Sequence, residues 1–306
     1  MPGLLLLFLT AYALIALIGA AVIVLMIVRP GRKTYAFAVA HGLPSEPADL
    51  GLAGEEVAFN LPGGHTAPGW IIPGKQPGGP TVLVLHGHRD FTYGAMRFVQ
   101  ALAPFSGHIV LFDWPGHGGC TAPWMTCGKR EPDDVLAVIE GLPDAIRQRP
   151  IVLFGYSLGG QIAVKTAGLY PDRFAGLVID GAYRRWDSPI RLKLKRYRVP
   201  SFPFIQLTWL VFYLGNLIRH FDRAAYARQY PGPMLVMHGT DDRICPFDEG
   251  KDLADAAPNS TFVPFEGGQH NRLHEQEPEA YREALANLFS TLPPLPAGAG
   301  RGEGAA

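Results

Sequence analysis

The sequence predicts an α/β fold: a mostly parallel sheet flanked by helices, with a cap insertion and an N-terminal transmembrane helix. Two observations carry this prediction. Short runs of β-branched and other apolar residues alternate with longer helical patterns, as is typical of parallel strands joined by helical crossovers. A long uncharged segment also stands ahead of the first strand, and it has the length of a membrane span.

The N-terminal segment from Leu4 to Val28 contains no charged residue. As a helix it would reach roughly 37 Å, more than the hydrocarbon core of about 30 Å requires. A secretory signal peptide is the competing interpretation, but its apolar stretch of about 7–15 residues usually follows a basic segment. We therefore expect residues 4–28 to be an uncleaved anchor. Arg29, Arg32 and Lys33 follow it, so the positive-inside rule predicts a single-pass membrane protein with its domain in the cytoplasm.

The composition excludes several function classes. The chain has 306 residues, with 27 basic and 27 acidic side chains, so no overall positive charge would attract nucleic acid. The length favours one catalytic domain with extensions at its ends. Three cysteines, Cys120, Cys127 and Cys245, match no zinc or disulfide spacing. We therefore expect free thiols, as in a reducing compartment, with no metal and no cofactor.

The order of elements places one domain behind the anchor. Residues 29–64 are rich in glycine and proline and are expected to form a tether, with an edge hairpin as an option near Glu55. The folded domain is expected over residues 65–292. The predicted strands are Thr81–Leu85, Ile109–Asp113, Ile151–Gly155, Leu177–Asp180, Met234–His238 and Thr261–Phe265. Helices are predicted near residues 92–104, 132–148, 158–170, 248–256 and 276–292. The tail, residues 293–306, lacks apolar content and is expected to be disordered.

An insertion at residues 183–231 interrupts the alternation of strands and helices. It begins with a strongly basic stretch, Arg184 to Arg198, and continues with an apolar, aromatic stretch from Phe202. A segment of this kind can dock on anionic lipid, or its apolar face can pack over an active site as a cap. The sequence supports both interpretations equally.

The strongest local motif is Gly155-Tyr156-Ser157-Leu158-Gly159, which follows an apolar strand and opens a helix. In a nucleophile elbow the serine occupies a sharp, strained turn, and the flanking glycines are needed because side chains there would strike the neighbouring strand and helix. This context predicts Ser157 as a nucleophile at a helix N-terminus.

A serine needs a histidine to accept its proton and a carboxylate to orient that histidine. Downstream of Ser157, a turn with His238, Asp241 and Asp242 follows one predicted strand, and Gly-Gly-Gln-His270 follows the next. Serine, acid and histidine occur in that order along the chain in enzymes with the nucleophile elbow. His270 is thus the candidate base, and the acid is either Asp241 or Asp242.

Together these motifs resemble the α/β-hydrolase superfamily. Within it the chain is similar to membrane-anchored serine hydrolases of the serine-aminopeptidase-like and acyl-protein-thioesterase-like branch. The resemblance implies Asp242 as the acid, because the family's His-Gly-x-x-Asp turn places the acid four residues after its histidine; Asp241 remains the alternative. It also implies an oxyanion hole formed by the backbone N–H groups of Leu158 and of His88, in the turn after the strand Thr81–Leu85.

A metal hydrolase is the rival interpretation of the same turn. His86, His88 and Asp90 resemble the metal-binding turn of the metallo-β-lactamase fold, but position 91 is Phe91 where that motif has a further histidine. No later cluster has ligand spacing. The sequence therefore favours a serine mechanism without metal.

The predicted function is hydrolysis of a carboxylic ester or thioester through an acyl-enzyme on Ser157, without a cofactor. The substrate would be a small molecule or a lipid or acylated compound at the membrane. Two alternatives stay open: a peptidase or amidase of the same fold, and an inactive membrane-anchored interaction module. The presence of a serine, an acid and a histidine in the expected order favours the enzyme.

Overall fold

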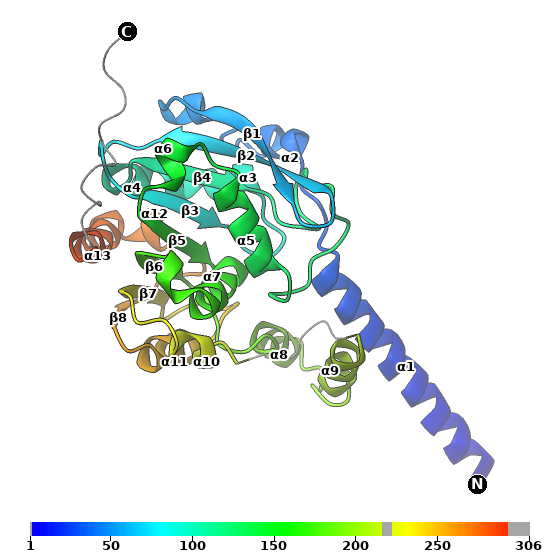
Figure 1. Ribbon diagram of the computed structural model, residues 1–306. Coiled ribbons are helices and arrows are strands. Elements are labelled where there is room, and N and C mark those ends of the chain that lie inside the picture. Colours follow the sequence, from blue (N-terminus) through cyan, green and yellow to red (C-terminus); the bar gives the residue numbers. More distant parts are fainter. Residues whose placement is uncertain (1, 216–221, 293–306) are drawn as a thin grey trace.

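The computed structural model describes residues 2–215 and 222–292; the predicted tail, residues 293–306, lies outside them. An eight-stranded sheet of order β1-β2-β4-β3-β5-β6-β7-β8 forms the centre of the domain (Figure 1). The strands are β1 (Glu55–Leu61), β2 (His65–Pro73), β3 (Thr81–Leu85), β4 (His108–Phe112), β5 (Ile151–Tyr156), β6 (Gly176–Asp180), β7 (Met234–Gly239) and β8 (Ser260–Phe265).

The six strands from β3 to β8 run parallel, which confirms the predicted fold class. The edge hairpin is antiparallel: β1 pairs with β2, and β2 also pairs antiparallel with β4. Strand β2 is not among the predicted strands, because Pro68 and Gly69 lie inside it and both residues are poor strand formers. Gly69 is required there, since a Cβ atom would strike the Leu111 carbonyl of β4.

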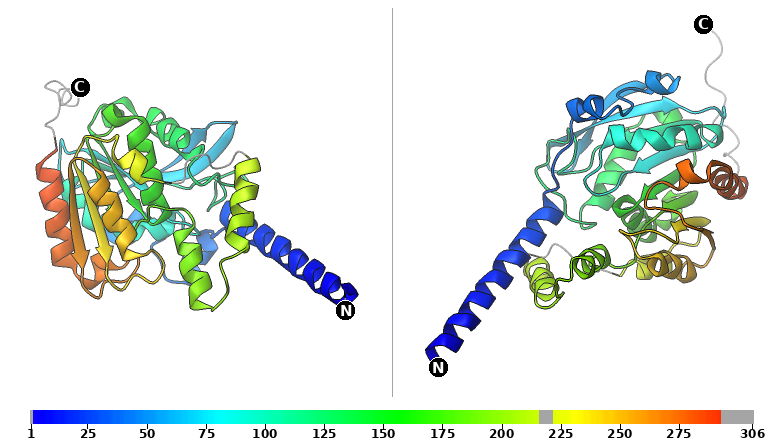
Figure 2. Two further views of the ribbon diagram at one scale, coloured as in Figure 1. Left: turned by 90° about the horizontal axis from the view of Figure 1, so that it is seen from below. Right: turned by 180° about the vertical axis from the view of Figure 1, so that it is seen from behind.

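Helices cover both faces of the sheet (Figures 1 and 2). The longer helices are α1 (Pro2–Val28), α2 (Tyr35–Ala40), α5 (Glu131–Glu140), α7 (Leu158–Leu169), α8 (Ser188–Arg196), α9 (Phe204–Leu214), α11 (Phe247–Ala256) and α13 (Pro278–Ser290). Single turns of helix are α3 (Thr92–Ala95), α4 (Val99–Leu102), α6 (Asp144–Arg147), α10 (Ala224–Ala227) and α12 (Leu273–Gln276). The helix predicted over 132–148 is divided into α5 and α6, because Gly141 and Pro143 lie between them.

The core consists of two apolar layers, one on each face of the sheet. Alternate residues of β3 enter different layers: Leu83 and Leu85 pack with α5, α7 and α11, whereas Val82 and Val84 pack with α4 and α13. Both faces of the parallel strands are covered, which explains why their sequences are continuous apolar runs instead of alternating patterns. The carboxyl ends of β5, β7 and β8 are thereby fixed relative to one another.

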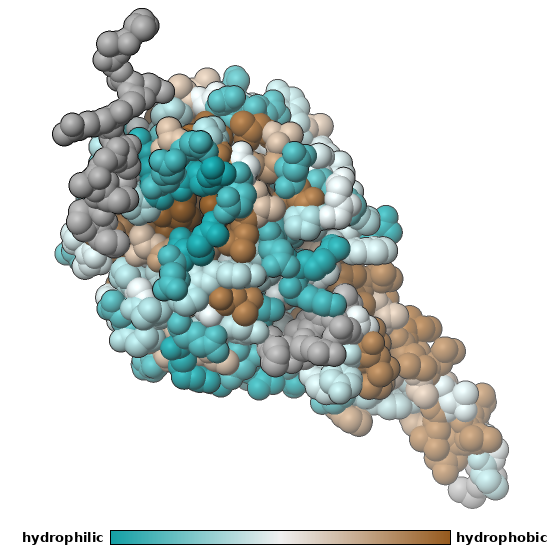
Figure 3. Space-filling model, viewed as in Figure 1, coloured by the Kyte–Doolittle hydropathy of each residue, from teal (hydrophilic) through white to brown (hydrophobic). Residues whose placement is uncertain are grey.

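The apolar helix α1 projects from the domain (Figure 1). In the part of the chain that the structure describes, it is the one helix long and apolar enough to cross a membrane. Figure 3 shows hydrophobic side chains gathered along it up to its junction with the domain. The cap helix α9 lies against α1 (Figures 1 and 2).

The segment expected to be a tether is folded onto the domain. It contains α2 and a 3-10 turn at Pro47–Leu50. The Arg32 guanidinium donates to the carbonyls of Cys120 and Ala122 at 2.6 and 2.7 Å. The domain therefore begins close to the end of α1.

Candidate active site

Ser157 lies in the sharp turn between β5 and α7, with a left-handed φ of 54°. Its amide donates to the Asp180 carbonyl at 2.9 Å. A Cβ atom on Gly159 would collide with the Leu85 carbonyl, and one on Gly155 would lie 2.5 Å from the Gly159 oxygen. The two glycines therefore allow the turn to pack between β3 and α7, and the serine is held in a conformation that L-residues rarely adopt.

The structure brings Ser157, His270 and Asp242 together at the carboxyl end of the sheet. The Ser157 hydroxyl lies 3.1 Å from His270 Nε2, and His270 Nδ1 lies 2.7 Å from Asp242 Oδ2. With Nδ1 protonated, the histidine donates to the carboxylate and accepts from the serine. This is the arrangement in which a histidine can remove the serine proton.

Asp242 is held as an anion. Its Oδ1 atom accepts hydrogen bonds from the amides of Ile244 and Cys245, both at 2.8 Å, and His238 Nε2 lies 3.4 Å from Oδ2. Burial alone would raise the pKa of Asp242, but hydrogen bonds from His238 and His270 and from the Cys245 amide hold it well below the usual range. The carboxylate therefore stays charged opposite His270.

Asp241, the alternative acid, occupies a different position. Its side chain is exposed, and its amide donates to the Gly268 carbonyl at 3.0 Å. Within the described residues, Asp242 is the carboxylate that bonds to His270.

The turn after β3 packs directly on the serine, since a Cβ atom on Gly87 would lie 3.2 Å from Ser157 Cβ. His86 braces this turn: its Nε2 atom accepts from the Trp114 amide at 3.2 Å, and its Nδ1 atom donates to the Gly87 carbonyl at 2.9 Å. Burial lowers the pKa of His86, so the ring stays neutral with both nitrogens engaged. His86 is thus structural, in accord with its place in the turn.

The side chain of His88 makes a contact that the sequence did not reveal. Its Nε2 atom lies 3.0 Å from the carbonyl oxygen of Ile27, in the last turn of α1. The two residues are far apart in the chain, and no local pattern links them. The next amide, that of Arg89, donates to His117 Nε2 at 3.2 Å.

A metal ion does not fit these residues. One group within the described residues, Asp242, Cys245 and His270, has ligand atoms within 4.8 Å of one another. However, both carboxylate oxygens and both ring nitrogens already have partners. Burial raises the pKa of the Cys245 thiol well above its ordinary value, so it stays protonated and is a poor ligand.

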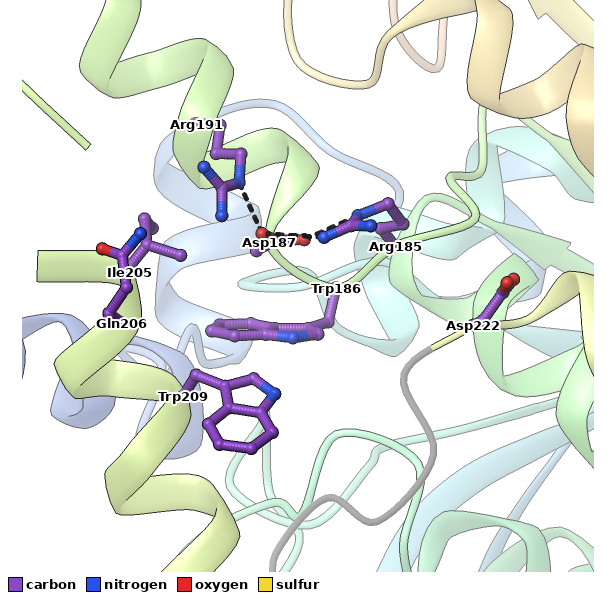
Figure 4. A pocket seen from close by; sticks show the side chains of 8 residues that line it. All are labelled: Arg185, Trp186, Asp187, Arg191, Ile205, Gln206, Trp209 and Asp222. Carbon is purple, nitrogen blue, oxygen red and sulfur yellow. Dashed lines mark hydrogen bonds and ion pairs between the residues drawn. The ribbon is translucent and has the colours of Figure 1, made fainter. Parts of the chain in front are cut away.

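A separate cavity of about 240 Å³ lies in the cap (Figure 4). In it Asp187 forms ion pairs with Arg191 at 2.5 Å and with Arg185 at 3.2 Å. Ser157, His270 and Asp242 do not line this cavity. The cavity is lined by Arg185, Trp186, Asp187, Arg191, Ile205, Gln206, Trp209 and Asp222.

Curated relatives share a quarter or more of the aligned residues. The human protein ABHD12B is 27% identical over 221 residues, covering 67% of this chain and 59% of the relative. The lysophosphatidylserine lipase ABHD12 of Danio rerio is 26% identical, covering 64% and 54% of the two chains. This chain thus spans less than two thirds of either protein. An uncharacterized protein of Mycobacterium tuberculosis is 29% identical, and the aligned region covers 85% of this chain and 86% of that protein.

Solved structures share the fold. The Pyrococcus furiosus esterase Pf2001 has a TM-score of 0.70 at 19% identity, covering 87% of this chain and 98% of that one. Est1E from Butyrivibrio proteoclasticus has a TM-score of 0.58 at 15% identity, covering 77% and 99%. The model of the alpha/beta hydrolase family matches residues 82–284, which include the serine, the acid and the histidine. The chain therefore belongs to the alpha/beta hydrolase family.

Proposed function

We propose that the chain is a serine hydrolase that cleaves a carboxylic ester or thioester through an acyl-enzyme on Ser157. The observation that carries the proposal is the continuous hydrogen-bonded path from Ser157 Oγ to His270 and on to Asp242, at 3.1 and 2.7 Å. An inactive interaction module would have no use for this path. Membership of the alpha/beta hydrolase family supports the same conclusion.

The reaction follows from the geometry. Ser157 Oγ attacks the acyl carbon while its proton passes to His270 Nε2. His270 then protonates the leaving alcohol or thiol, and the acyl group remains on the serine. A water molecule, deprotonated by His270, attacks the acyl-enzyme and releases the carboxylic acid, and the proton returns to Ser157. Asp242 holds Nδ1 protonated and stabilises the imidazolium that forms in each half-reaction.

The negative charge on the acyl oxygen requires donors that are already in place. The amide of Leu158 follows the serine at the start of α7, and the amide of His88 belongs to the turn that packs on Ser157. Within the described residues neither amide donates to another protein group. Two such donors each contribute about 3 kcal/mol of transition-state stabilisation, so we propose that these amides form the oxyanion hole.

The substrate that fits best is an amphiphile at a membrane, a lipid or an acylated compound. The apolar helix α1 would hold the active site beside a bilayer, and one relative is described as a lysophosphatidylserine lipase. Arg29, Arg32 and Lys33 follow α1, which supports a single-pass protein with the domain in the cytoplasm. The alternative, a peptidase or amidase, uses the same three residues.

A panel of matched substrates tests the reaction class. Esters, thioesters and amides carrying the same acyl group would be hydrolysed by the full chain in detergent micelles, with Ser157→Ala as the control. We expect kcat/KM to be highest for the esters or thioesters, to rise with acyl chain length, and to vanish in the variant. Preferential cleavage of the amides would establish the peptidase alternative, and activity in Ser157→Ala would refute the mechanism.

A further inference from the structure

Helix α9 exposes apolar side chains on several sides. Its sequence, Phe204 to Leu214, contains no charged residue, and three of its residues, Ile205, Thr208 and Phe212, are buried. Apart from Gln206 and Thr208 its residues are apolar, and a helix that is apolar on most sides belongs in a protein core or in a membrane. Five further apolar side chains are 43 to 73% exposed: Trp209, Leu210, Val211, Tyr213 and Leu214.

The contact between α9 and α1 indicates what covers the exposed apolar side chains of α9. Ala16 and Ala20 are the buried residues of α1, and the ring of Phe204 lies on Gly19 so closely that a Cβ atom there would be 2.5 Å from the ring. Small residues permit this close approach between helices in membranes. The N-terminal end of α9 therefore packs against α1, the candidate membrane span.

The position of Gly19 sets a depth. It lies nine residues before the last residue of α1, which is about 14 Å along the helix. The uncharged run exceeds the hydrocarbon thickness by about 7 Å. The smallest depth results if all of this excess length projects from the membrane on the side of the domain. Even then Gly19, and Phe204 against it, would lie about 7 Å inside the hydrocarbon.

Helix α8, which precedes α9 in the chain, is basic, whereas α9 is uncharged and mostly apolar. Lys193, Lys195 and Arg196 of α8 and the following Arg198 are exposed. Clusters of lysine and arginine beside a span are attracted to anionic headgroups. We propose that α9 is embedded in the same leaflet as the C-terminal half of α1, with the basic residues of α8 on the headgroups of an anionic bilayer. This proposal does not depend on the proposed catalytic activity.

The test measures insertion separately from anchoring by α1. An environment-sensitive dye is placed on Leu214→Cys in the full chain, reconstituted in nanodiscs of phosphatidylcholine and phosphatidylserine. The three native cysteines are buried, and the unaltered chain controls for their labelling. The matched control is Glu279→Cys on α13, whose side chain is 81% exposed. We expect brominated lipids to quench the dye at 214 and not at 279, and aqueous iodide to do the reverse.

Two results would overturn the proposal. Equal quenching by iodide at both positions would mean that α9 lies in water. Protection from iodide without quenching by brominated lipid would assign the surface to a protein partner or a second copy. Replacing Lys193, Lys195 and Arg196 by glutamate should reduce the lipid quenching in anionic nanodiscs; unchanged quenching would refute the role of α8.

A separate observation, the bond from His88 to Ile27, carries a second inference, which rests on the proposed function. The last carbonyls of a helix lack partners within the helix. His88 Nε2 donates to the Ile27 carbonyl, and the Met125 amide donates to the Val28 carbonyl at 2.9 Å. Burial lowers the pKa of His88, so the ring is neutral, and its Nε2 atom carries the proton because the Ile27 carbonyl can only accept. We infer that His88 is a positioning residue. Its side chain links the turn after β3, which carries the proposed oxyanion-hole amide, to the C-terminal end of α1.

The test separates positioning from general structural damage. His88→Leu cannot donate, whereas His88→Gln retains an N–H group at a similar reach. We expect the leucine variant to lose about tenfold or more in kcat on a short soluble ester, with KM nearly unchanged, and the glutamine variant to recover most of the loss. The rate at which a fluorophosphonate labels Ser157 should fall in parallel.

If the leucine variant keeps its kcat, or if the glutamine and leucine variants lose activity equally, the inference is wrong. A wild-type chain without activity or labelling would instead refute the proposed function, so the two failures are distinguishable.

Discussion

His270 Nδ1 lies 2.7 Å from Oδ2 of Asp242, whereas the adjacent carboxylate in the chain is exposed. The difference arises because the turn after β7 directs one aspartate inward, where two backbone amides fix it. This relationship separates two residues that the sequence could distinguish only by resemblance to a family.

Replacing Asp242 should cripple the reaction. In Asp242→Asn the amide cannot hold the required tautomer of His270, and we expect kcat to fall by about 10³ to 10⁴. Asp241→Asn is the matched control and should stay within about threefold of the unaltered chain. Steady-state hydrolysis of a soluble ester measures both. The opposite ranking would transfer the role to Asp241.

Replacing Gly159 should strongly destabilise the fold. A methyl group there strikes the Leu85 carbonyl of β3, and neither backbone can yield without moving the sheet. Gly159→Ala should lower the free energy of unfolding by about 3 kcal/mol or more. Gly31→Ala, which meets nothing within 4 Å, should be neutral in the same denaturant titration. A stable, active Gly159→Ala chain would show that the turn is looser than described.

His274 should make the domain sensitive to acid. It is packed against Phe98, with ring centroids 4.4 Å apart; burial and, secondarily, Arg97 lower its pKa to about 4. Between about pH 6.5 and 4 the unfolded chain binds a proton there that the folded chain does not. The folded state therefore loses stability as pH falls through this window, by on the order of 3 kcal/mol. Thermal unfolding of His274→Phe should be less sensitive to this window; an identical pH profile would contradict the assignment.

The native thiols should be unreactive in the folded chain. All three cysteines are buried, and burial raises the pKa of Cys120 to about 11. Because the thiolate is the reactive form, alkylation by iodoacetamide at neutral pH should be negligible until the chain is denatured. Mass spectrometry counts the adducts, and rapid modification of any of the three residues would contradict this burial.

Much of the fold could be predicted because its parallel strands are continuous apolar runs. The missed strand β2 contains Pro68 and Gly69, which local propensity places in a loop, and it is a strand because it pairs with β1 and β4. Ser157 and His270 could be proposed because each follows a strand in a recognisable turn. The bond from His88 to Ile27 could not, because it joins distant segments and depends on how α1 docks on the domain.

Covalent labelling of Ser157 tests the central proposal most directly. The full chain would be treated with a fluorophosphonate probe, digested and analysed by mass spectrometry beside Ser157→Ala and His270→Ala. We expect one adduct, on Ser157, that is absent in Ser157→Ala and strongly reduced in His270→Ala. No labelling of the unaltered chain, or equal labelling of Ser157→Ala, would contradict the serine mechanism.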